Sequence, residues 1–474
     1  MQELPCREAS SSIGLERTAT MKLPKYNSPL LPSCVIDPEL LDQAHFEMQR
    51  DRIPGIALGI YHNGCAATTG VGVTNMLHPQ PVGGDTLFQI ASITKTFTAT
   101  AVLQLVEQGR LRLDDPIRTH LPQFTVADPE VSAAVTIRDC LTHSCGWEGD
   151  FYEDPGWGDD ALATMVARMG KLPQVTPLGR IWSYNNAAFY VLGRILEVLH
   201  GRPYEDVLKE ALLTPLGLDD TCFFAHDVLH RNFAVGHAER RGQTVIARPW
   251  AMPRCGNPIG GLIASAEHLV RYARFQLDGA AVLGDAMRLA AFEPAGPSRD
   301  TPEIGLGWWV DAAPGERIVF HAGGANGQPC LFAMVPSRRF AIAVLTNGVN
   351  GWITAERLLA WAIKTYFGLA APDPQNQPCA NVDAWLGTYD TRLERRVLRR
   401  EGERLMLDQT PLKEWLDGLS PPTLPQSGIE VQPLGPDKML IAPGRREQLV
   451  GTVLCDGNEG YRWLRVHRRA SLRK

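Results

Sequence analysis

Phe88-Gln-Ile-Ala-Ser-Ile-Thr-Lys95, followed by the apolar run Thr96 to Gln108, is the stretch of sequence that decides the fold. Ser92 and Lys95 are three residues apart, so in a helix that begins at Ser92 they lie one turn apart on the same face. A desolvated lysine loses its charge and can take a proton from serine, while the N–H groups of a helix start can stabilise an oxyanion. Alone this pattern is weak, because it also fits a capped surface helix with a solvated lysine.

Composition excludes several classes of function. The chain has 474 residues, and at roughly 150 residues per domain this predicts two or three units. Lys plus Arg number 47 against 52 for Asp plus Glu, so the net charge is −5 and no nucleic-acid partner is expected. No apolar run reaches the ~20 residues that cross a bilayer, so we expect no membrane partner.

The cysteines and histidines indicate neither a metal site nor another cofactor. The ten cysteines form no C-x-x-C pair, and His226 and His230 at i, i+4 lack a third ligand. Scattered thiols in a long chain are typical of a reducing compartment, so a cytoplasmic location is expected. The cysteines are Cys6, Cys34, Cys65, Cys140, Cys145, Cys222, Cys255, Cys330, Cys379 and Cys455.

Four parts are expected along the chain. Residues 1–34 have no apolar core and are predicted to be a loosely ordered tail rather than a secretory signal, with Met21 as an alternative start. Residues 35–370 carry the helical and strand patterns of a larger domain. Residues 371–380 are rich in proline and are interpreted as a linker. Residues 381–474 show short alternating strands, which predict a small β domain.

The larger domain is predicted to be α+β, because strands occur early and late with helices before, between and after them. Asn63-Gly64 is a hairpin signal between two early strands, and Asn185 to His200 has a strong helical stripe that ends at Gly201. The other elements expected are late strands at Gly305 to Val310, Arg317 to Ala322, Cys330 to Val335 and Ala341 to Leu345, then a helix at Ala355 to Phe367.

Two further motifs strengthen the interpretation of Ser92. They are Trp182-Ser-Tyr-Asn-Asn186 and Phe320-His-Ala-Gly-Gly324. The chain thus has Ser-x-x-Lys, then Tyr-x-Asn, then a basic residue-x-Gly. This order of motifs resembles the penicillin-recognising serine hydrolases, which include serine β-lactamases, DD-peptidases, esterases and amidases. The resemblance covers roughly Val35 to Phe367. It implies a β-lactamase/transpeptidase-like antiparallel sheet flanked by helices, with a helical insertion.

The resemblance implies a role for each matching residue. Ser92 would form an acyl-enzyme, Lys95 would be neutral and relay protons, and Tyr184 would pass a proton to the leaving group. Asn186 would hydrogen-bond both the substrate and Lys95. His321 would supply electrostatic or hydrogen-bonding help.

The oxyanion hole implied by the resemblance is formed by the backbone N–H groups of Ser92 and Gly324. Gly323 and Gly324 would let the backbone approach the substrate closely. Relatives that act on β-lactams or peptidoglycan often have a hydroxyl residue where this chain has Ala322, and that hydroxyl helps to bind a carboxylate. We therefore expect a small-molecule ester, lactone or amide substrate without a carboxylate.

Alternatives remain at this stage. The same acyl-enzyme also serves an acyltransferase, a β-lactamase or a D-amino-acid peptidase, and a third class is a non-catalytic scaffold or filament-forming relative.

The C-terminal β domain supplies no matched catalytic residue and is expected to shape the pocket or an oligomer contact, so a homo-oligomer is left open. Its arginines are interpreted as solvated strand faces: Arg395, Arg396, Arg399, Arg400, Arg468 and Arg469. Aromatic residues expected near the pocket, although each alone fits the core better, are Trp147, Phe151, Tyr152, Trp157, Trp250 and Trp308.

Overall fold

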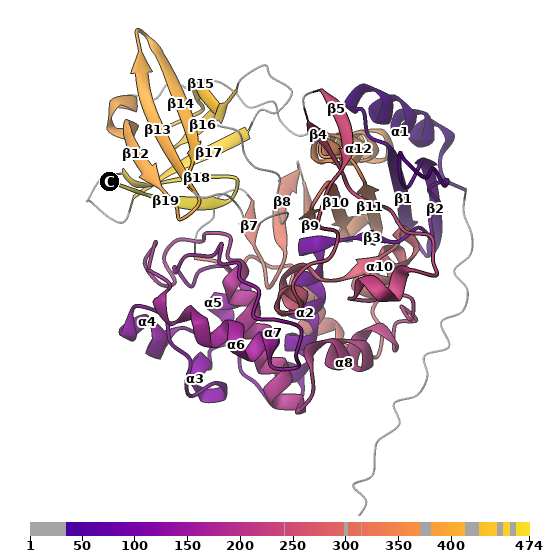
Figure 1. The fold of residues 1–474 in the computed structure, drawn as a ribbon, viewed down its shortest axis with the longest axis horizontal. Coiled ribbons are helices and arrows are strands. Elements are labelled where there is room, and N and C mark those ends of the chain that lie inside the picture. Colours follow the sequence, from indigo (N-terminus) through magenta and orange to yellow (C-terminus); the bar gives the residue numbers. More distant parts are fainter. Residues whose placement is uncertain are drawn as a thin grey trace, which may run out of the picture.

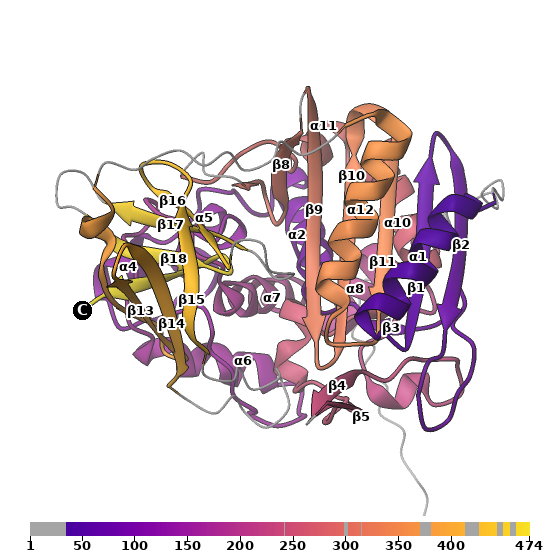
Figure 2. The ribbon, with the colours of Figure 1, turned by 90° about the horizontal axis from the view of Figure 1, so that it is seen from above.

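The computed structural model describes residues 35–240, 242–297, 302–313, 315–369, 381–412, 426–442, 449–455 and 461–474. The tail predicted for residues 1–34 and the linker predicted for 371–380 lie outside these residues. The described chain forms a larger α+β body and a smaller β-barrel, which lie side by side in Figures 1 and 2.

A seven-stranded sheet runs through the larger body in the order β2-β1-β11-β10-β9-β8-β7, and every neighbouring pair is antiparallel. Asn63 and Gly64 close the β1–β2 hairpin with φ of 50° and 87°, as the Asn-Gly signal predicted. The early hairpin joins the late strands because β1 pairs with β11, with Ile56 opposite Thr346. The strands are β1 Gly55–His62, β2 Cys65–Gly72, β7 Glu303–Ile304, β8 Trp309–Ala313, β9 Glu316–Ala325, β10 Gln328–Val335 and β11 Phe340–Thr346.

Helices cover both faces of this sheet (Figure 2). Helices α1 (Pro38–Asp51) and α12 (Gly351–Phe367) pack on one face, and α10 (Ala266–Asp278) packs on the other, beside α2 (Thr94–Glu107). Side chains alternate between the two faces, so Leu331 joins the apolar cluster under α1 and α12 whereas Phe332 joins the cluster around α2. The sheet is therefore buried on both sides.

A helical insertion separates α2 from the late strands. Helix α7 (Asn186–His200) is its longest helix, and it begins where the Asn185 side chain accepts a hydrogen bond from Ala188 N at 2.9 Å. It ends at Gly201, whose φ of 66° is the left-handed conformation that glycine tolerates. The remaining helices of this body are α3 Ile117–His120, α4 Pro129–Ala134, α5 Ile137–Leu141, α6 Ala161–Ala167, α8 Tyr204–Leu208, α9 Asn257–Gly260 and α11 Asp285–Ala290. Two short sheets pair β3 Phe88–Gln89 with β6 Ile263–Ala264, and β4 His237–Arg240 with β5 Gln243–Ile246.

The C-terminal residues form a closed eight-stranded barrel, β12 to β19, in chain order. Its interior is filled by apolar side chains such as Trp385, Leu407 and Leu464. The strands are β12 Gly387–Asp390, β13 Glu394–Glu401, β14 Arg404–Pro411, β15 Gln426–Pro433, β16 Lys438–Ile441, β17 Leu449–Cys455, β18 Tyr461–Val466 and β19 Arg469–Arg473. With this barrel and the helix-flanked sheet, the predicted α+β class with a C-terminal β domain is confirmed.

The β18–β19 hairpin of the barrel packs against the segment that leads into α7. Trp463 Nε1 donates to Val175 O at 2.7 Å, and the Arg465 guanidinium lies 3.8 Å from the centre of the Trp182 ring. Ala470 N donates to Ser183 Oγ at 3.0 Å. The barrel is thus attached directly beside the predicted Tyr-x-Asn motif.

Two predictions need correction. Of the strand predicted at Gly305 to Val310, only Trp309 and Val310 are in a strand, β8, whereas residues 305–308 form a turn after β7, because Gly307 has φ 81° and reverses the chain. The ten cysteines are not all thiols, since Cys65 on β2 is in a disulfide, whereas Cys140, Cys145, Cys222, Cys255 and Cys330 are free.

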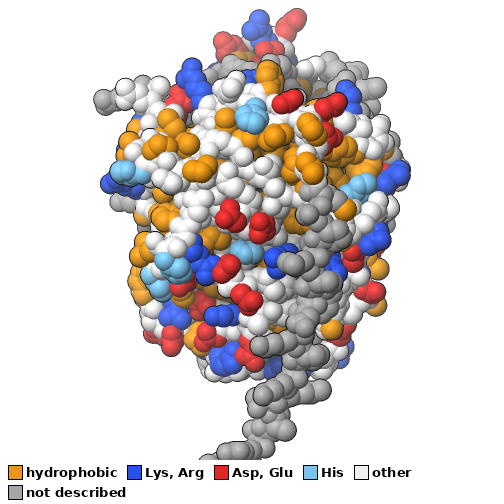
Figure 3. Space-filling model, turned by 90° about the vertical axis from the view of Figure 1, so that its right-hand side faces the viewer, with side chains coloured by type: hydrophobic (Ala, Val, Ile, Leu, Met, Phe, Trp, Pro, Cys, Tyr) orange, Lys and Arg blue, Asp and Glu red, His pale blue; other side chains and the backbone are white. Residues whose placement is uncertain are grey.

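Within the described ranges, no helix is long and apolar enough to cross a membrane. On the face that Figure 3 shows, acidic and basic side chains are interspersed rather than separated. That face therefore presents neither sign of charge as a single large patch.

Candidate active site

Ser92 lies in a short 3₁₀ turn, Ala91–Ile93, that leads directly into α2. The preceding Ala91 has φ 45°, a left-handed conformation that is uncommon for alanine and marks a tightly constrained turn. Ser92 is half-buried, whereas α2 behind it is enclosed along most of its length. The predicted helix start at the nucleophile is therefore present, with one 3₁₀ turn before the α-helix.

Lys95 is completely buried beside Ser92. Its Nζ donates to Ser92 Oγ at 3.1 Å and also to the carbonyl oxygen of Ile259 in α9. Burial, assisted by the positive charge of Arg469, holds the pKa of Lys95 well below its usual value, and Asp150 opposes this shift. The amine is thus placed to take the proton of Ser92.

Tyr184 lies against Lys95, with the lysine Nζ 5.1 Å from the centre of the phenol ring. Burial raises the pKa of Tyr184 to about 12, although the Ser92 hydroxyl and Arg469 act in the other direction. The phenol therefore keeps its proton at neutral pH. Its buried oxygen makes no hydrogen bond to another described residue that meets normal geometry, so its proton is available to a bound molecule.

Asn186 at the start of α7 has partners that differ from those expected. Its Nδ2 donates to Asp150 Oδ1 at 3.1 Å and to the Tyr152 hydroxyl at 2.7 Å. Among the described contacts, Asn186 makes no hydrogen bond to Lys95, and the Lys95 amine donates to the carbonyl oxygen of Ile259 instead. Asp150 was not predicted as a site residue, whereas Tyr152 was among the aromatic residues expected near the pocket.

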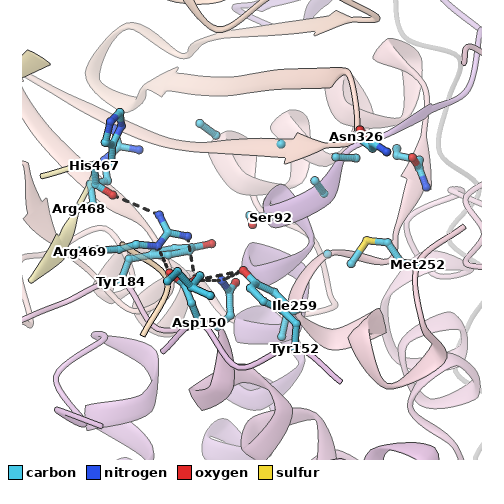
Figure 4. A pocket seen from close by; sticks show the side chains of 18 of the residues that line it. Ser92, Asp150, Tyr152, Tyr184, Met252, Ile259, Asn326, His467, Arg468 and Arg469 are labelled. Atoms are coloured by element: carbon cyan, nitrogen blue, oxygen red, sulfur yellow. Dashed lines mark hydrogen bonds and ion pairs between the residues drawn. The ribbon is translucent and has the colours of Figure 1, made fainter. Parts of the chain in front are cut away.

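Asp150 forms an ion pair with an arginine of the barrel. Arg469 on β19 binds its carboxylate through Nε and Nη2, the latter at 3.1 Å, and the guanidinium also lies 5.1 Å from the centre of the Tyr184 ring. Figure 4 shows this pair between the barrel turn and the loop that carries Tyr152. A residue from the C-terminal domain is therefore part of the active-site network, which contradicts the solvated face expected for Arg469.

His321 on β9 is buried and neutral. Burial and the nearby Lys95 hold its pKa well below 6.5. Its Nδ1 lies 2.8 Å from Ala322 O, which places the proton on Nδ1 and leaves Nε2 as an acceptor without a partner among the described residues. His321 can therefore accept a hydrogen bond in the site, but it supplies no positive charge.

Gly323 and Gly324 bring β9 close to the nucleophile. A Cβ on Gly323 would collide with the Ile90 carbonyl and lie 3.1 Å from Ser92 N, so only glycine permits this approach. A Cβ on Gly324 would collide with the Trp352 ring. The close approach of Gly323 to the Ser92 turn is compatible with an oxyanion hole formed by the backbone N–H groups of Ser92 and Gly324, which stays a prediction.

A pocket of about 400 Å³ contains these groups. Of the expected aromatic residues, Tyr152 and Trp250 line it, whereas Trp147, Phe151 and Trp308 belong to the core and Trp157 is exposed. The barrel contributes part of the wall. Its lining residues are Thr391, Leu393, Glu394, Arg396, His467, Arg468 and Arg469. The arginine-rich C-terminal sequence was the available signal for this contribution, but its place in space depends on long-range packing.

No group of three or more His, Cys, Asp or Glu side chains that could hold a metal ion occurs among the residues that the structure describes.

One family model and several known proteins are similar to the larger body of this chain. The model of the Beta-lactamase family matches residues 43–363. Penicillin-binding protein 4 of Amycolatopsis lactamdurans is 35% identical over 329 residues, which cover 65% of this chain and 86% of that protein. Protein flp of Staphylococcus aureus strain MW2 is 26% identical, and the match spans about three-fifths (61%) of its length.

Solved structures share the fold over most of the chain. The crystal structure of SurE has a TM-score of 0.73 at 24% identity and covers 92% of this chain and 98% of its own, so the likeness includes the barrel. The octameric penicillin-binding protein homologue from Pyrococcus abyssi has a TM-score of 0.63 at 22% identity, with 92% and 99% covered. EstCE1, a hydrolase with promiscuous acyltransferase activity, has a TM-score of 0.54 at 20% identity, with 66% and 94% covered.

Proposed function

The chain belongs to the Beta-lactamase family, and on that premise we propose that it is a serine hydrolase that cleaves an ester, lactone or amide bond through an acyl-enzyme on Ser92. The observation that carries the proposal is the contact of 3.1 Å between Lys95 Nζ and Ser92 Oγ, with the lysine fully buried and its pKa held low. A scaffold protein has no need of a buried lysine that is aimed at a serine.

In the first half of the reaction, neutral Lys95 takes the proton of Ser92 as Oγ attacks the substrate carbonyl. The N–H groups of Ser92 and Gly324 donate to the oxygen that becomes negative. Lys95 is then an ammonium in a buried site, which is costly, so its extra proton is readily passed on.

In the second half, the leaving group takes a proton from the Tyr184 phenol, and Lys95 replaces that proton. The bond between the carbonyl carbon and the leaving group breaks, and the acyl group stays on Ser92. Water then attacks the acyl-enzyme, with the same groups working in the reverse direction. Because the pKa of Tyr184 is raised to about 12, its protonated form is the one that acts.

Labelling with a fluorophosphonate, followed by peptide mapping, tests the proposal. The reagent should modify Ser92, and Ser92→Ala should lose both labelling and ester hydrolysis while keeping its far-UV circular dichroism. Ser337 lies in an exposed turn after β10 and is a matched control, since Ser337→Ala should react as the wild type does. Wild-type rates of p-nitrophenyl ester hydrolysis by Ser92→Ala would contradict the mechanism.

Acyl transfer is a second candidate, supported by the likeness to EstCE1, which is described as a hydrolase with promiscuous acyltransferase activity. The two functions differ only in whether water or another nucleophile attacks the acyl-enzyme. Product analysis with and without an added alcohol or amine distinguishes them. The β-lactamase and D-amino-acid peptidase alternatives are tested by turnover of nitrocefin and of D-Ala-D-Ala peptides.

The partner proposed is a small-molecule substrate, with a homo-oligomer suggested by the octameric homologue from Pyrococcus abyssi. Light scattering during size-exclusion chromatography would give the mass of the assembly. The proposed cytoplasmic location rests on the free cysteines among the described residues, and the Cys65 disulfide argues against it. Mass spectrometry of alkylated protein from its native cell would decide between a reduced and an oxidised Cys65.

A further inference from the structure

His143, in the turn after α5, holds the backbone on both sides of Tyr184. Its carbonyl oxygen accepts a hydrogen bond from Ser183 N at 2.9 Å, and its Nδ1 accepts one from Asn185 N at 3.1 Å. The N–H of Tyr184, between them, donates instead to Arg468 O in the barrel turn at 2.8 Å. The backbone of the reacting tyrosine is thus fixed between His143 and the barrel.

The His143 ring also sets the orientation of the phenol. It is buried, and its centre lies 4.7 Å from that of the Tyr184 ring. Trp309 stacks on both rings, with centres 5.5 Å from His143 and 5.6 Å from Tyr184, and Phe189 lies 5.4 Å from His143. Because buried rings pack closely, the Tyr184 ring cannot tilt without displacing His143.

The imidazole of His143 is neutral. Burial, assisted by the nearby Lys95, lowers the pKa of His143 to about 3. Since Nδ1 accepts the hydrogen bond from Asn185 N, the proton of the ring is on Nε2. A protonated ring would carry a hydrogen on Nδ1 and would lose this hydrogen bond, so the neutral form is the one that holds the backbone beside Tyr184.

The turn that carries His143 is held by its own side chains. His143 has φ 56°, a left-handed conformation. The hydroxyl oxygens of Thr142 and Ser144 on either side lie 2.9 Å apart, and Ser144 Oγ donates to Asp139 Oδ1 in α5 at 3.0 Å. The direction of the ring is therefore determined by the turn and not by contact with Tyr184 alone.

We propose that His143 is a positioning residue for proton transfer, which holds the Tyr184 hydroxyl at the leaving group through its carbonyl, its Nδ1 and its ring. The inference rests on the proposed acyl-enzyme on Ser92 and deepens it. The phenol gives its proton to the leaving oxygen as the bond to the carbonyl carbon breaks, and the ammonium of Lys95 replaces that proton. His143 does not line the pocket, so it acts through Tyr184 and not on the substrate.

Two esters with the same acyl group test the proposal, because they differ in whether the leaving group needs a proton. p-Nitrophenolate leaves without one, whereas ethoxide must be protonated as it leaves. kcat/KM, which reports the steps up to acylation, is measured for p-nitrophenyl butyrate and ethyl butyrate. His143→Gly suits the left-handed φ and removes the ring and Nδ1. It should lower kcat/KM on the ethyl ester about ten- to a hundredfold more than on the p-nitrophenyl ester.

A conservative variant measures how much of this effect comes from the hydrogen bond. His143→Asn tolerates the left-handed φ and offers an amide oxygen to Asn185 N, so its extra loss on the ethyl ester should be smaller than that of His143→Gly. If His143→Gly fails to fold, His143→Asn decides, because its loss must still be larger on the ethyl ester than on the p-nitrophenyl ester.

Tyr184→Phe decides whether His143 acts through the tyrosine. In that background His143→Gly should leave the ratio of the two kcat/KM values unchanged, because no phenol proton remains to be positioned. An equal loss on both esters in the single variant would overturn the proposal. So would the same additional loss on the ethyl ester in the Tyr184→Phe background.

His78 is the matched control, because it is an exposed histidine after β2 that does not line the pocket, and His78→Asn should keep the wild-type ratio. Fluorophosphonate labelling separates this proposal from the proposed function, since labelling uses Ser92 and Lys95 and expels fluoride. Both His143 variants should be labelled at close to the wild-type rate. Absence of labelling at Ser92 in the wild type would instead refute the proposed function.

Discussion

Burial of Lys95 lowers the stability of the fold and keeps the amine uncharged and reactive. An unfolded lysine is protonated up to its ordinary pKa of 10.5, whereas the buried Lys95 loses its proton well below that value. Between the two pKa values the unfolded chain binds more protons, so stability rises with pH in that window and burial is costly at neutral pH.

Lys95→Met should therefore raise the Tm at pH 7 while abolishing activity. We expect a gain of several degrees, since 1 kcal/mol shifts the Tm of a large domain by about 2–4 °C. The gain should shrink as the pH is raised toward 10.5, where wild-type Lys95 no longer gives up a proton on folding. Thermal unfolding of both proteins from pH 6 to pH 10 measures this, and a Tm gain that does not vary with pH would contradict a depressed pKa.

Lys95 and Tyr184 are expected to act as one unit, because the lysine Nζ lies 5.1 Å from the centre of the tyrosine ring. Both residues take part in transferring the same proton. Lys95→Met and Tyr184→Phe should each lower kcat by about a hundredfold or more. The double variant should lose far less than the product of the two effects. Kinetics on a p-nitrophenyl ester give the three values, and full multiplication would show that the residues act separately.

At the scale of elements, the β18–β19 hairpin controls the charge around Lys95. Arg469 lowers the pKa of Lys95 and Asp150 raises it, and the two groups neutralise each other in an ion pair. Arg469→Gln removes the positive charge and leaves Asp150 unpaired, so the pKa of Lys95 should rise.

Activity requires neutral Lys95 and falls as the pH drops through its pKa, so the acidic limb of the kcat/KM profile should move to higher pH in Arg469→Gln. Arg469→Lys should restore most of the profile. A lower kcat/KM without any movement of the acidic limb would indicate that Arg469 only holds the structure together.

The hairpin also marks the limit of what the sequence could predict. The spacing of Ser92 and Lys95, the stripe and end of α7, and the Asn63-Gly64 turn depend on neighbouring residues, and all three were predicted. The pairing of Arg469 with Asp150 joins residues 319 positions apart, and no local pattern indicates it. The partners of Asn186 were missed for the same reason, because Asp150 belongs to a loop whose path is fixed by packing.

At the scale of the whole molecule, the barrel supplies contacts to buried groups of the larger body. It supplies the acceptor for Tyr184 N and the partner of Asp150, whose side chain is only 6% exposed. It also covers Trp182 through Arg465. The larger body alone would keep Ser92, Lys95 and the oxyanion hole, but it would hold a buried carboxylate without a counter-ion beside them.

A chain that ends at Leu369 should therefore fold less stably and react differently, so the barrel is expected to do more than shape the pocket. We expect at least a hundredfold lower kcat/KM on p-nitrophenyl esters and slower fluorophosphonate labelling of Ser92, because the uncompensated charge of Asp150 raises the pKa of Lys95. Asp150→Asn in the shortened chain removes that charge and should recover part of the labelling rate, which separates the electrostatic effect from general loosening. Far-UV circular dichroism checks that both proteins are folded. Labelling at the wild-type rate in the folded, shortened chain would show that the barrel covers the pocket without taking part in its chemistry.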